Sequence, residues 1–229
     1  MNWLITGGCG FIGRSLIAHI FKNNTVARIR VIDNFSVGKK EYLAEVSSFF
    51  EADPSPLCPQ FSTPSPISME SVSGDIRYFN TCLKCCKDID LVFHLAANTG
   101  VAPSVENPRY GNKCHWHLQY ARCCLAKQCK KIHICILRST YRGKEPPITE
   151  DKPPRPVSPY GANKLAGEGY CSAYIERLVS KPFLYVNETT MHEIACKIKE
   201  IVDMVSEKEG GIIFSKPRTG DVKRNYSDI

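Results

Sequence analysis

Two side chains that could together move a proton stand four residues apart late in the chain. Tyr160 and Lys164 occur in the stretch Tyr-Gly-Ala-Asn-Lys, and this spacing places both on one face of a helix. A nearby ammonium favours the phenolate form of a tyrosine, whose ordinary pKa is about 10. The pair could therefore serve as a base toward an alcohol, although the same spacing is also commonplace on solvated helices.

Three glycines near the N-terminus could hold a phosphate group. Gly7, Gly10 and Gly13 follow an apolar run at residues 1–6 and precede apolar positions at helical spacing in residues 14–21. The first glycine permits a tight turn, the second lets a pyrophosphate approach the backbone, and the third lets the helix pack on the strand. The N–H groups at the start of that helix face the phosphates. Strand, glycine turn and helix together predict a dinucleotide-binding fingerprint.

An acidic residue ends the next predicted strand. Asp33 follows the short β-branched run at residues 28–32, about 20 residues past the glycines. A carboxylate at this place accepts hydrogen bonds from the adenosine ribose and would repel a 2′-phosphate. Because no arginine follows it directly, the sequence predicts NAD in preference to NADP, the alternative being an ordinary turn aspartate.

The elements that must position these residues alternate along the chain. Residues 1–35 are expected to form strand, helix and strand, and residues 51–68 and 146–159 are expected to be proline-rich loops. Further helices are expected near 79–87, 113–129, 160–178 and 192–204, and further strands at 89–97 and 131–137. This alternation predicts an α/β fold with a Rossmann-like doubly wound parallel sheet.

Composition excludes several classes of protein. The net charge of +7 is scattered and forms no basic stripe for nucleic acid, and no apolar run is long enough to cross a membrane. The N-terminus shows no signal-peptide pattern, so we expect a cytoplasmic protein whose twelve cysteines are reduced thiols. The cysteine and histidine spacings at 82–86 and 114–135 match no standard zinc pattern, so no metal site is expected.

The chain resembles the extended short-chain dehydrogenase/reductase family, specifically its NAD-dependent nucleotide-sugar epimerases and dehydratases of the UDP-glucose 4-epimerase type. The matching segments are TGGCGFIG, VIDN, GDIR, HLAA, SPYGANK and PRTGD, and they occur in the family's order at residues 6–13, 31–34, 74–77, 94–97, 158–164 and 217–221. Such an ordered set is very hard to obtain by chance.

The resemblance implies a role for each matching position. Tyr160 would be the catalytic base, Lys164 would bind the nicotinamide ribose, and the family's catalytic Ser/Thr falls at Ser139 or Thr140. Arg218 matches a position that pairs with the diphosphate of a nucleotide sugar, with a UDP-sugar favoured. The residues implied to contact NAD are Gly7, Gly10, Phe11, Ile12, Gly13, Asp33, Asn34, Asp75, Ile76, Leu95, Ala96, Ala97, Thr99, Tyr160 and Lys164.

The reaction implied is a 4-epimerisation. Tyr160 would take the proton of the C4 hydroxyl while hydride passes to NAD, and hydride would then return to the other face of the 4-keto sugar. Dehydratase and decarboxylase relatives usually carry an acid beside the catalytic Ser/Thr, whereas Tyr141 and Arg142 follow here, which favours the epimerase. A nucleotide-sugar 4,6-dehydratase or decarboxylase stays open, and the sequence does not specify the sugar.

Parts of the family pattern are missing from this chain. The later strands and sugar contacts expected between Tyr174 and Phe183 are absent, and residues 112–119 depart from the pattern. We therefore expect a truncated member, with an NAD-binding Rossmann-like domain over 1–180 and a remnant of the substrate-binding region over 181–229. Such a chain would be a weak catalyst of low stability, or a non-catalytic NAD-binding remnant. Whether it forms a homodimer is left open.

Overall fold

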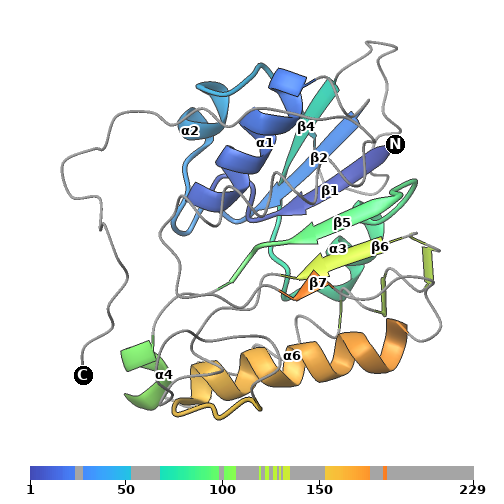
Figure 1. Ribbon diagram of the computed structural model, residues 1–229. Helices are drawn as coiled ribbons and strands as arrows, with labels where there is room; N and C mark the ends of the chain where they lie inside the picture. The colour runs from blue at the N-terminus through green and yellow to red at the C-terminus, as the bar shows by residue number, and fades with distance from the viewer. Residues whose placement is uncertain are drawn as a thin grey trace.

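The computed structural model places a large N-terminal portion of the chain and several later pieces. The described residues are 1–23, 28–52, 68–97, 101–106, 119, 122–123, 126–127, 129, 131–134, 153–175 and 183–184. Within them, helices and strands alternate around a parallel sheet (Figure 1). The helices are α1 (Phe11–Asn23), α2 (Lys40–Ala44), α3 (Phe79–Cys85), α4 (Val101–Glu106) and α6 (Pro159–Ile175).

The sheet is doubly wound. Its strands lie side by side in the order β3 (Phe50–Ala52), β4 (Ser68–Ser73), β2 (Arg28–Asp33), β1 (Asn2–Thr6), β5 (Leu91–His94), β6 (Lys131–Ile134) and β7 (Phe183–Leu184). Every neighbouring pair in this order is parallel. The chain moves outward from β1 in one direction and then returns to β5 on the other side. This is the Rossmann-like architecture that the sequence predicted, and the prediction is confirmed.

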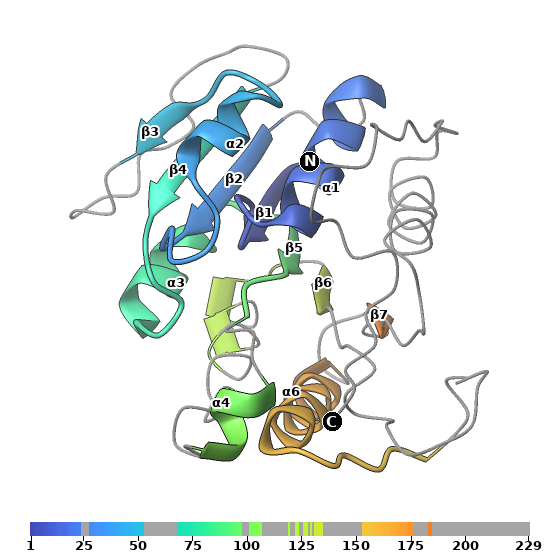
Figure 2. The ribbon, with the colours of Figure 1, turned by 90° about the vertical axis from the view of Figure 1, so that its left-hand side faces the viewer.

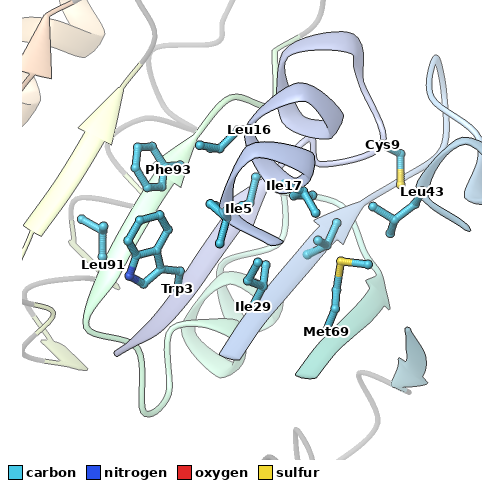
Figure 3. Packing of buried hydrophobic residues seen from close by; sticks show 12 residues of the cluster. Trp3, Ile5, Cys9, Leu16, Ile17, Ile29, Leu43, Met69, Leu91 and Phe93 are labelled. Atoms are coloured by element: carbon cyan, nitrogen blue, oxygen red, sulfur yellow. The ribbon is translucent and has the colours of Figure 1, made fainter. Parts of the chain in front are cut away.

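Side chains alternate between the two faces of the sheet and build two separate cores. On one face, Trp3 and Ile5 of β1 pack beneath Leu16 and Ile17 of α1 (Figure 3). The ring of Trp3 also lies 5.2 Å from that of Phe93, centroid to centroid. Full burial of each large apolar side chain contributes about 1.5–3 kcal/mol, so this face fixes α1 firmly over β1.

The opposite face of the sheet is covered by α3, so α1 and α3 lie on opposite sides of the central strands (Figure 2). Leu4 and Ile32 point to this side and pack with a group of buried cysteines. These cysteines are thiols rather than disulfides, and they are Cys82, Cys85, Cys86, Cys123 and Cys129. A hydrogen bond from Cys86 lowers the pKa of Cys123 despite the opposing effect of burial.

The start of α6 is set by its own sequence and by α4. Ser158 caps the helix, since its hydroxyl accepts a hydrogen bond from Gly161 N–H at 3.1 Å, and Pro159 occupies the first helical position. The Tyr160 N–H donates to the Ser104 hydroxyl at 3.2 Å and so ties α6 to α4. These bonds fix the orientation of the helix that carries Tyr160.

Where the residues are described, the expected helices and strands agree with the structure except at some of their ends and in one expected loop. The strand expected over 89–97 ends at His94, and the expected helix at 79–87 ends at Cys85. The loop expected over 51–68 is wrong at both ends, because Glu51 and Ala52 belong to β3 and Ser68 begins β4. The helix expected over 192–204, and most of that over 113–129, lie outside the described residues.

Strand β4 escaped prediction because its buried residues are largely polar. Glu70 forms an ion pair with Arg30 of β2, in which the Arg30 Nε donates to a Glu70 carboxylate oxygen. The Arg30 guanidinium also donates to the carbonyl oxygens of Cys85 at 2.8 Å and Lys87 at 2.9 Å. The pair therefore joins β2, β4 and the end of α3. Because the two charges neutralise each other, both residues can be buried, whereas charged residues in a sequence pattern usually indicate the surface.

Candidate functional site

The predicted cofactor residues gather at the carboxyl ends of the central strands. The order of the sheet reverses between β1 and β5, and ligands of such sheets bind in the crevice at this reversal. The glycine turn follows β1, Asp33 closes β2, Asp75 follows β4, and residues 95–97 follow β5. In a parallel sheet these ends share one edge, so the predicted residues come together there.

Two of the glycines are required by the close approach of backbone segments. Gly7 adopts φ +69°, and a β-carbon there would lie 2.8 Å from the backbone of Ala96. A β-carbon at Gly13 would lie 2.5 Å from the Gly7 carbonyl oxygen and from the Gly8 α-carbon. At Gly10 the corresponding position meets only the Gly7 carbonyl oxygen, at 3.2 Å. Gly10 thus leaves an open cradle, while Gly7 and Gly13 close the packing around it.

This cradle fits the pyrophosphate of a dinucleotide. The Gly10 N–H donates to the Gly7 carbonyl at 3.1 Å, and α1 begins directly afterwards, with Arg14 N–H donating to the Gly10 carbonyl at 3.0 Å. The first N–H groups of a helix have no acceptor within the helix, so those of Phe11 and Ile12 suit an anion. The residues present therefore match the group that the fold implies.

The Asp33 carboxylate is held by hydrogen bonds at both oxygens. Its Oδ2 accepts from Cys9 N–H at 3.0 Å, and its Oδ1 accepts from Phe35 N–H at 2.9 Å. Phe35 adopts the left-handed conformation, with φ 55°, at the turn after β2. Each carboxylate oxygen has two lone pairs, so Asp33 retains acceptors for ribose hydroxyls.

Asp75 is linked to the neighbouring turn. Its Oδ2 accepts from Asn34 Nδ2 at 3.2 Å and from Arg77 Nε at 2.9 Å, and its Oδ1 accepts from the Arg77 backbone N–H at 2.8 Å. Burial alone would raise the pKa of Asp75, but these hydrogen bonds outweigh burial and lower it. Ile76 is buried beside it and belongs to the core on the α3 face. Asp75 and Ile76, which the sequence predicts to flank the adenine, thus lie at the turn after β4 and beside Asn34.

A buried hydrogen-bonded set joins the ends of β1 and β5. The Thr6 hydroxyl lies 2.8 Å from His94 Nδ1 and accepts a hydrogen bond from Ala96 N–H at 3.0 Å. Burial, together with the positive charge of Lys164, lowers the pKa of His94 to about 3, so its imidazole is neutral. This set fixes the backbone of residues 95–97 beside the glycine turn.

The predicted proton-transfer pair is buried. Tyr160 and Lys164 are each 4% exposed, and the Lys164 ammonium lies 6.0 Å from the centre of the Tyr160 ring. After burial, the positive charge of Lys164 is the second cause that lowers the pKa of His94, the last residue of β5. A buried lysine beside a tyrosine is uncommon on a solvated helix, since lysine is rarely fully buried without a partner.

Four of the predicted site residues cannot be placed. Thr99, Ser139, Thr140 and Arg218 lie outside the described residues. Conversely, our sequence reasoning gave no role to Thr6, His94, Cys9 or Ser104. Thr6 and His94 lie opposite each other in the register of β1 and β5. A polar residue that closes each of two neighbouring buried strands was the signal that could have identified them.

Comparison with known proteins defines the family. The family model for the NAD dependent epimerase/dehydratase family matches residues 3–191. The chain therefore belongs to this family, as its sequence motifs predicted, and NAD is its cofactor.

Named relatives and solved structures are similar over part of their length. The chain is 31% identical over 181 residues to the UDP-glucose 4-epimerase of Mycolicibacterium smegmatis, covering 76% of this chain and 51% of the relative. It is 29% identical over 170 residues to that of Azospirillum brasilense, covering 72% and 42%. The UDP-glucose 4-epimerase of Thermotoga maritima superposes with a TM-score of 0.64 at 25% identity, covering 80% and 54%.

A second solved structure contains both cofactor and sugar nucleotide. A tyrosine-to-phenylalanine variant of UDP-glucuronic acid 4-epimerase from Bacillus cereus, with NAD and UDP-4-deoxy-4-fluoro-glucuronic acid, superposes with a TM-score of 0.63 at 26% identity. It is covered to 56%, and this chain to 81%. The chain spans about half the length of the curated relatives that it matches.

The described residues lack two further features. None of the helices placed there is long and apolar enough to cross a membrane. Within the same ranges, no three cysteine, histidine, aspartate or glutamate side chains converge in a way that could hold a metal ion.

Proposed function

We propose that this chain acts as a nucleotide-sugar 4-epimerase, with a UDP-sugar as the favoured substrate and Tyr160 as the base. The observation that carries the proposal is the burial of Tyr160 with Lys164 on α6, within electrostatic reach of His94 at the end of β5. The UDP-sugar 4-epimerases named above add support, since they are similar over most of this chain.

Each residue has a defined task in the proposed reaction. The positive charge of Lys164 stabilises the phenolate form of Tyr160. This phenolate accepts the proton of the sugar's C4 hydroxyl and becomes a neutral phenol, which returns the proton when the hydride comes back. The glycine turn and Asp33 hold the two ends of the cofactor's adenosine diphosphate portion. NAD, when bound, supplies the acceptor for the C4 hydride and gives that hydride back. Neutral His94 adds no second positive charge beside Lys164.

The test is the Tyr160→Phe variant, which keeps the ring and removes the titrating hydroxyl. We expect conversion of UDP-glucose to its C4 epimer to slow by at least about 10²-fold, the usual scale for a lost general base. The Kd for NAD, measured by calorimetry, should stay within about twofold of wild type. That change in binding free energy is well below the 1.4 kcal/mol of a tenfold change in Kd. Tyr170→Phe is the matched control, because Tyr170 lies on the same helix but is 37% exposed. Equal turnover by wild type and the Tyr160 variant would exclude Tyr160 as the base.

A second candidate is NAD binding without turnover, and one observation favours it. The chain spans about half the length of its curated relatives, while the described cofactor edge is well formed. A nucleotide-sugar 4,6-dehydratase or decarboxylase is separated from the epimerase by its product, since a 4-keto sugar or carbon dioxide would then be released. Product analysis of reactions with UDP-glucose and with UDP-glucuronic acid therefore distinguishes the epimerase, the dehydratase and the decarboxylase, and the absence of any product indicates NAD binding without turnover.

A further inference from the structure

Two serines hold the first turn of α6, one at the start of the helix and one from another element. Pro159 has no N–H to satisfy, and the Gly161 N–H donates to the hydroxyl of the capping residue Ser158 at 3.1 Å. The Tyr160 N–H instead donates to the hydroxyl of Ser104, on α4, at 3.2 Å. The backbone of the proposed base is therefore held by a separate element, 56 residues earlier in the chain.

This hydrogen bond is buried on both sides. Ser104 is 1% exposed and Tyr160 is 4% exposed, so water has little access to either partner. A buried N–H that loses its acceptor is costly, because nothing replaces the hydration that it gave up on folding. The position of the Ser104 hydroxyl therefore governs where the first turn of α6 lies.

Helix α4 connects this contact to the cofactor edge. It lies beside the start of α6 in both views of the molecule (Figure 1 and Figure 2), and it begins at Val101, shortly after residues 95–97 in the chain. The N–H groups of Leu95 and Ala96 donate to Thr6, at the end of β1. The chain thus leads from the cofactor edge through α4 to the hydroxyl that holds Tyr160.

We propose that Ser104 is a positioning residue, whose hydroxyl fixes the backbone of Tyr160 and so places the phenol, with Lys164 one turn further along α6, relative to the cofactor edge. The inference rests on the proposed function, in which the phenol must meet the sugar's C4 hydroxyl. A displacement of about 1 Å can cost on the order of 10²-fold in rate, because the reacting atoms need a narrow range of distances. Such a displacement leaves the glycine turn and its hold on NAD unchanged.

A purely structural role makes a different prediction. If Ser104 only stabilises the fold, Ser104→Ala lowers the melting temperature, while the folded protein keeps its kcat and the surroundings of Tyr160. If Ser104 positions Tyr160, kcat falls while KM and the Kd for NAD do not change. Adding Ser104→Ala to Tyr160→Phe should then slow turnover by less than about twofold more, because two changes that act through one group are not additive.

The test compares wild type with Ser104→Ala, Ser104→Thr and Asp90→Ala. We expect Ser104→Ala to lower kcat for UDP-glucose by about ten- to hundredfold, with KM and the Kd for NAD within about twofold of wild type. Ser104→Thr keeps the hydroxyl and should recover most of this rate. Asp90→Ala also removes the side-chain acceptor of a backbone N–H, but at the opposite edge of the sheet, and should leave kcat within about twofold. Should Ser104→Ala fail to fold, Ser104→Cys takes its place, because sulfur fills the space and is a weak acceptor.

A second measurement needs neither turnover nor cofactor. The NMR signals of the Tyr160 ring are identified by their absence from Tyr160→Phe. We expect these signals to shift in Ser104→Ala, to return toward their wild-type positions in Ser104→Thr, and to stay in place in Asp90→Ala. A serine that contributed only stability would leave them in place in all three variants.

The outcomes separate this inference from the proposed function. Unchanged ring signals, or an unchanged kcat in an active protein, would overturn the role of Ser104 while the proposed function stands. Equal losses of kcat in Ser104→Ala and Asp90→Ala would overturn it as well, since they would reflect stability alone. A wild type without turnover would overturn the proposed function, and the ring signals would then decide whether Ser104 positions Tyr160.

Discussion

At the scale of single residues, we expect Asp33 to set the preference for NAD over NADP. Its two oxygens are oriented by the glycine turn and by Phe35, which leaves lone pairs for a ribose. Asp33→Ala should weaken NAD binding by about 1–3 kcal/mol, as expected for a hydrogen bond to a charged group. The substitution should also reduce the difference in affinity between NAD and NADP, which calorimetry with both cofactors would measure.

Asp90→Ala is the matched control for this substitution. Asp90 also accepts a backbone hydrogen bond, from Asn2 N–H at 2.9 Å, but at the start of β1, the opposite edge of the sheet from the glycine turn. Its loss should affect stability without changing the preference between cofactors. Tighter binding of NADP than of NAD by wild type would contradict the role given to Asp33.

His94 should make the stability of the folded chain depend on pH in the acidic range. Its pKa is lowered to about 3 by burial and by Lys164, while the unfolded chain binds the same proton at about 6.5. Between these values the unfolded state carries more protons, so stability is lost as pH falls from about 6.5 toward 3. We expect the free energy of unfolding to drop by about 1–2 kcal/mol between pH 7 and pH 5 from this group.

Urea titrations at the two pH values, with His94→Asn beside wild type, would measure this effect. Asparagine retains a hydrogen-bonding group near Thr6 and does not titrate. The variant should therefore lose less stability between the two pH values than wild type does. An identical pH dependence for the two proteins would mean that His94 does not control it.

At the scale of elements, we expect two glycines of the glycine turn to have different roles, Gly13 in packing and Gly10 in ligand binding. Gly13→Ala places a β-carbon 2.5 Å from backbone atoms and should destabilise the fold by about 1–3 kcal/mol, the range for overpacking. Gly10→Ala meets only one atom, at 3.2 Å, and should melt close to wild type. It should still weaken NAD by at least about tenfold, or 1.4 kcal/mol, because its methyl group occupies the pyrophosphate cradle. Thermal melts with calorimetry on both variants check this, and an unweakened Gly10→Ala would show that the cradle does not hold the phosphates.

The same scale shows what the sequence could predict. Strands β1, β2 and β5 contain short runs of β-branched, apolar or aromatic residues, which a local sequence pattern reveals. The glycine turn is likewise recognised by backbone requirements within seven residues. Strand β4 depends on Arg30, which pairs with Glu70 across 40 residues of sequence. Likewise Thr6 and His94 are 88 residues apart, and Ser104 and Tyr160 are 56 apart. Partners at such distances are set by the topology, which one sequence does not display.

At the scale of the whole molecule, cofactor binding and catalysis make different demands. The described cofactor edge is formed by the ends of β1, β2, β4 and β5 and is held by bonds within the first hundred residues. Hydride transfer also requires the sugar carbon to be held about 3–3.5 Å from the nicotinamide, and small misplacements cost large factors in rate. The division at residue 180 into a cofactor domain and a substrate region stays a prediction, and β7, just beyond it, adds to the same sheet.

We therefore expect the 229-residue polypeptide, tested by itself, to bind NAD and to turn over UDP-glucose far more slowly than an ordinary enzyme. The physical reason is that its relatives are about twice as long, so this polypeptide has fewer residues that could contact the sugar. Calorimetry with NAD and UDP-glucose, followed by a turnover assay on the same preparation, measures both halves of this expectation. A turnover of about 1–10³ per second would contradict it, since that is the usual range for complete enzymes. In that case the residues after Ile175 would have to supply the sugar contacts, and Tyr160→Phe would then abolish the measured rate.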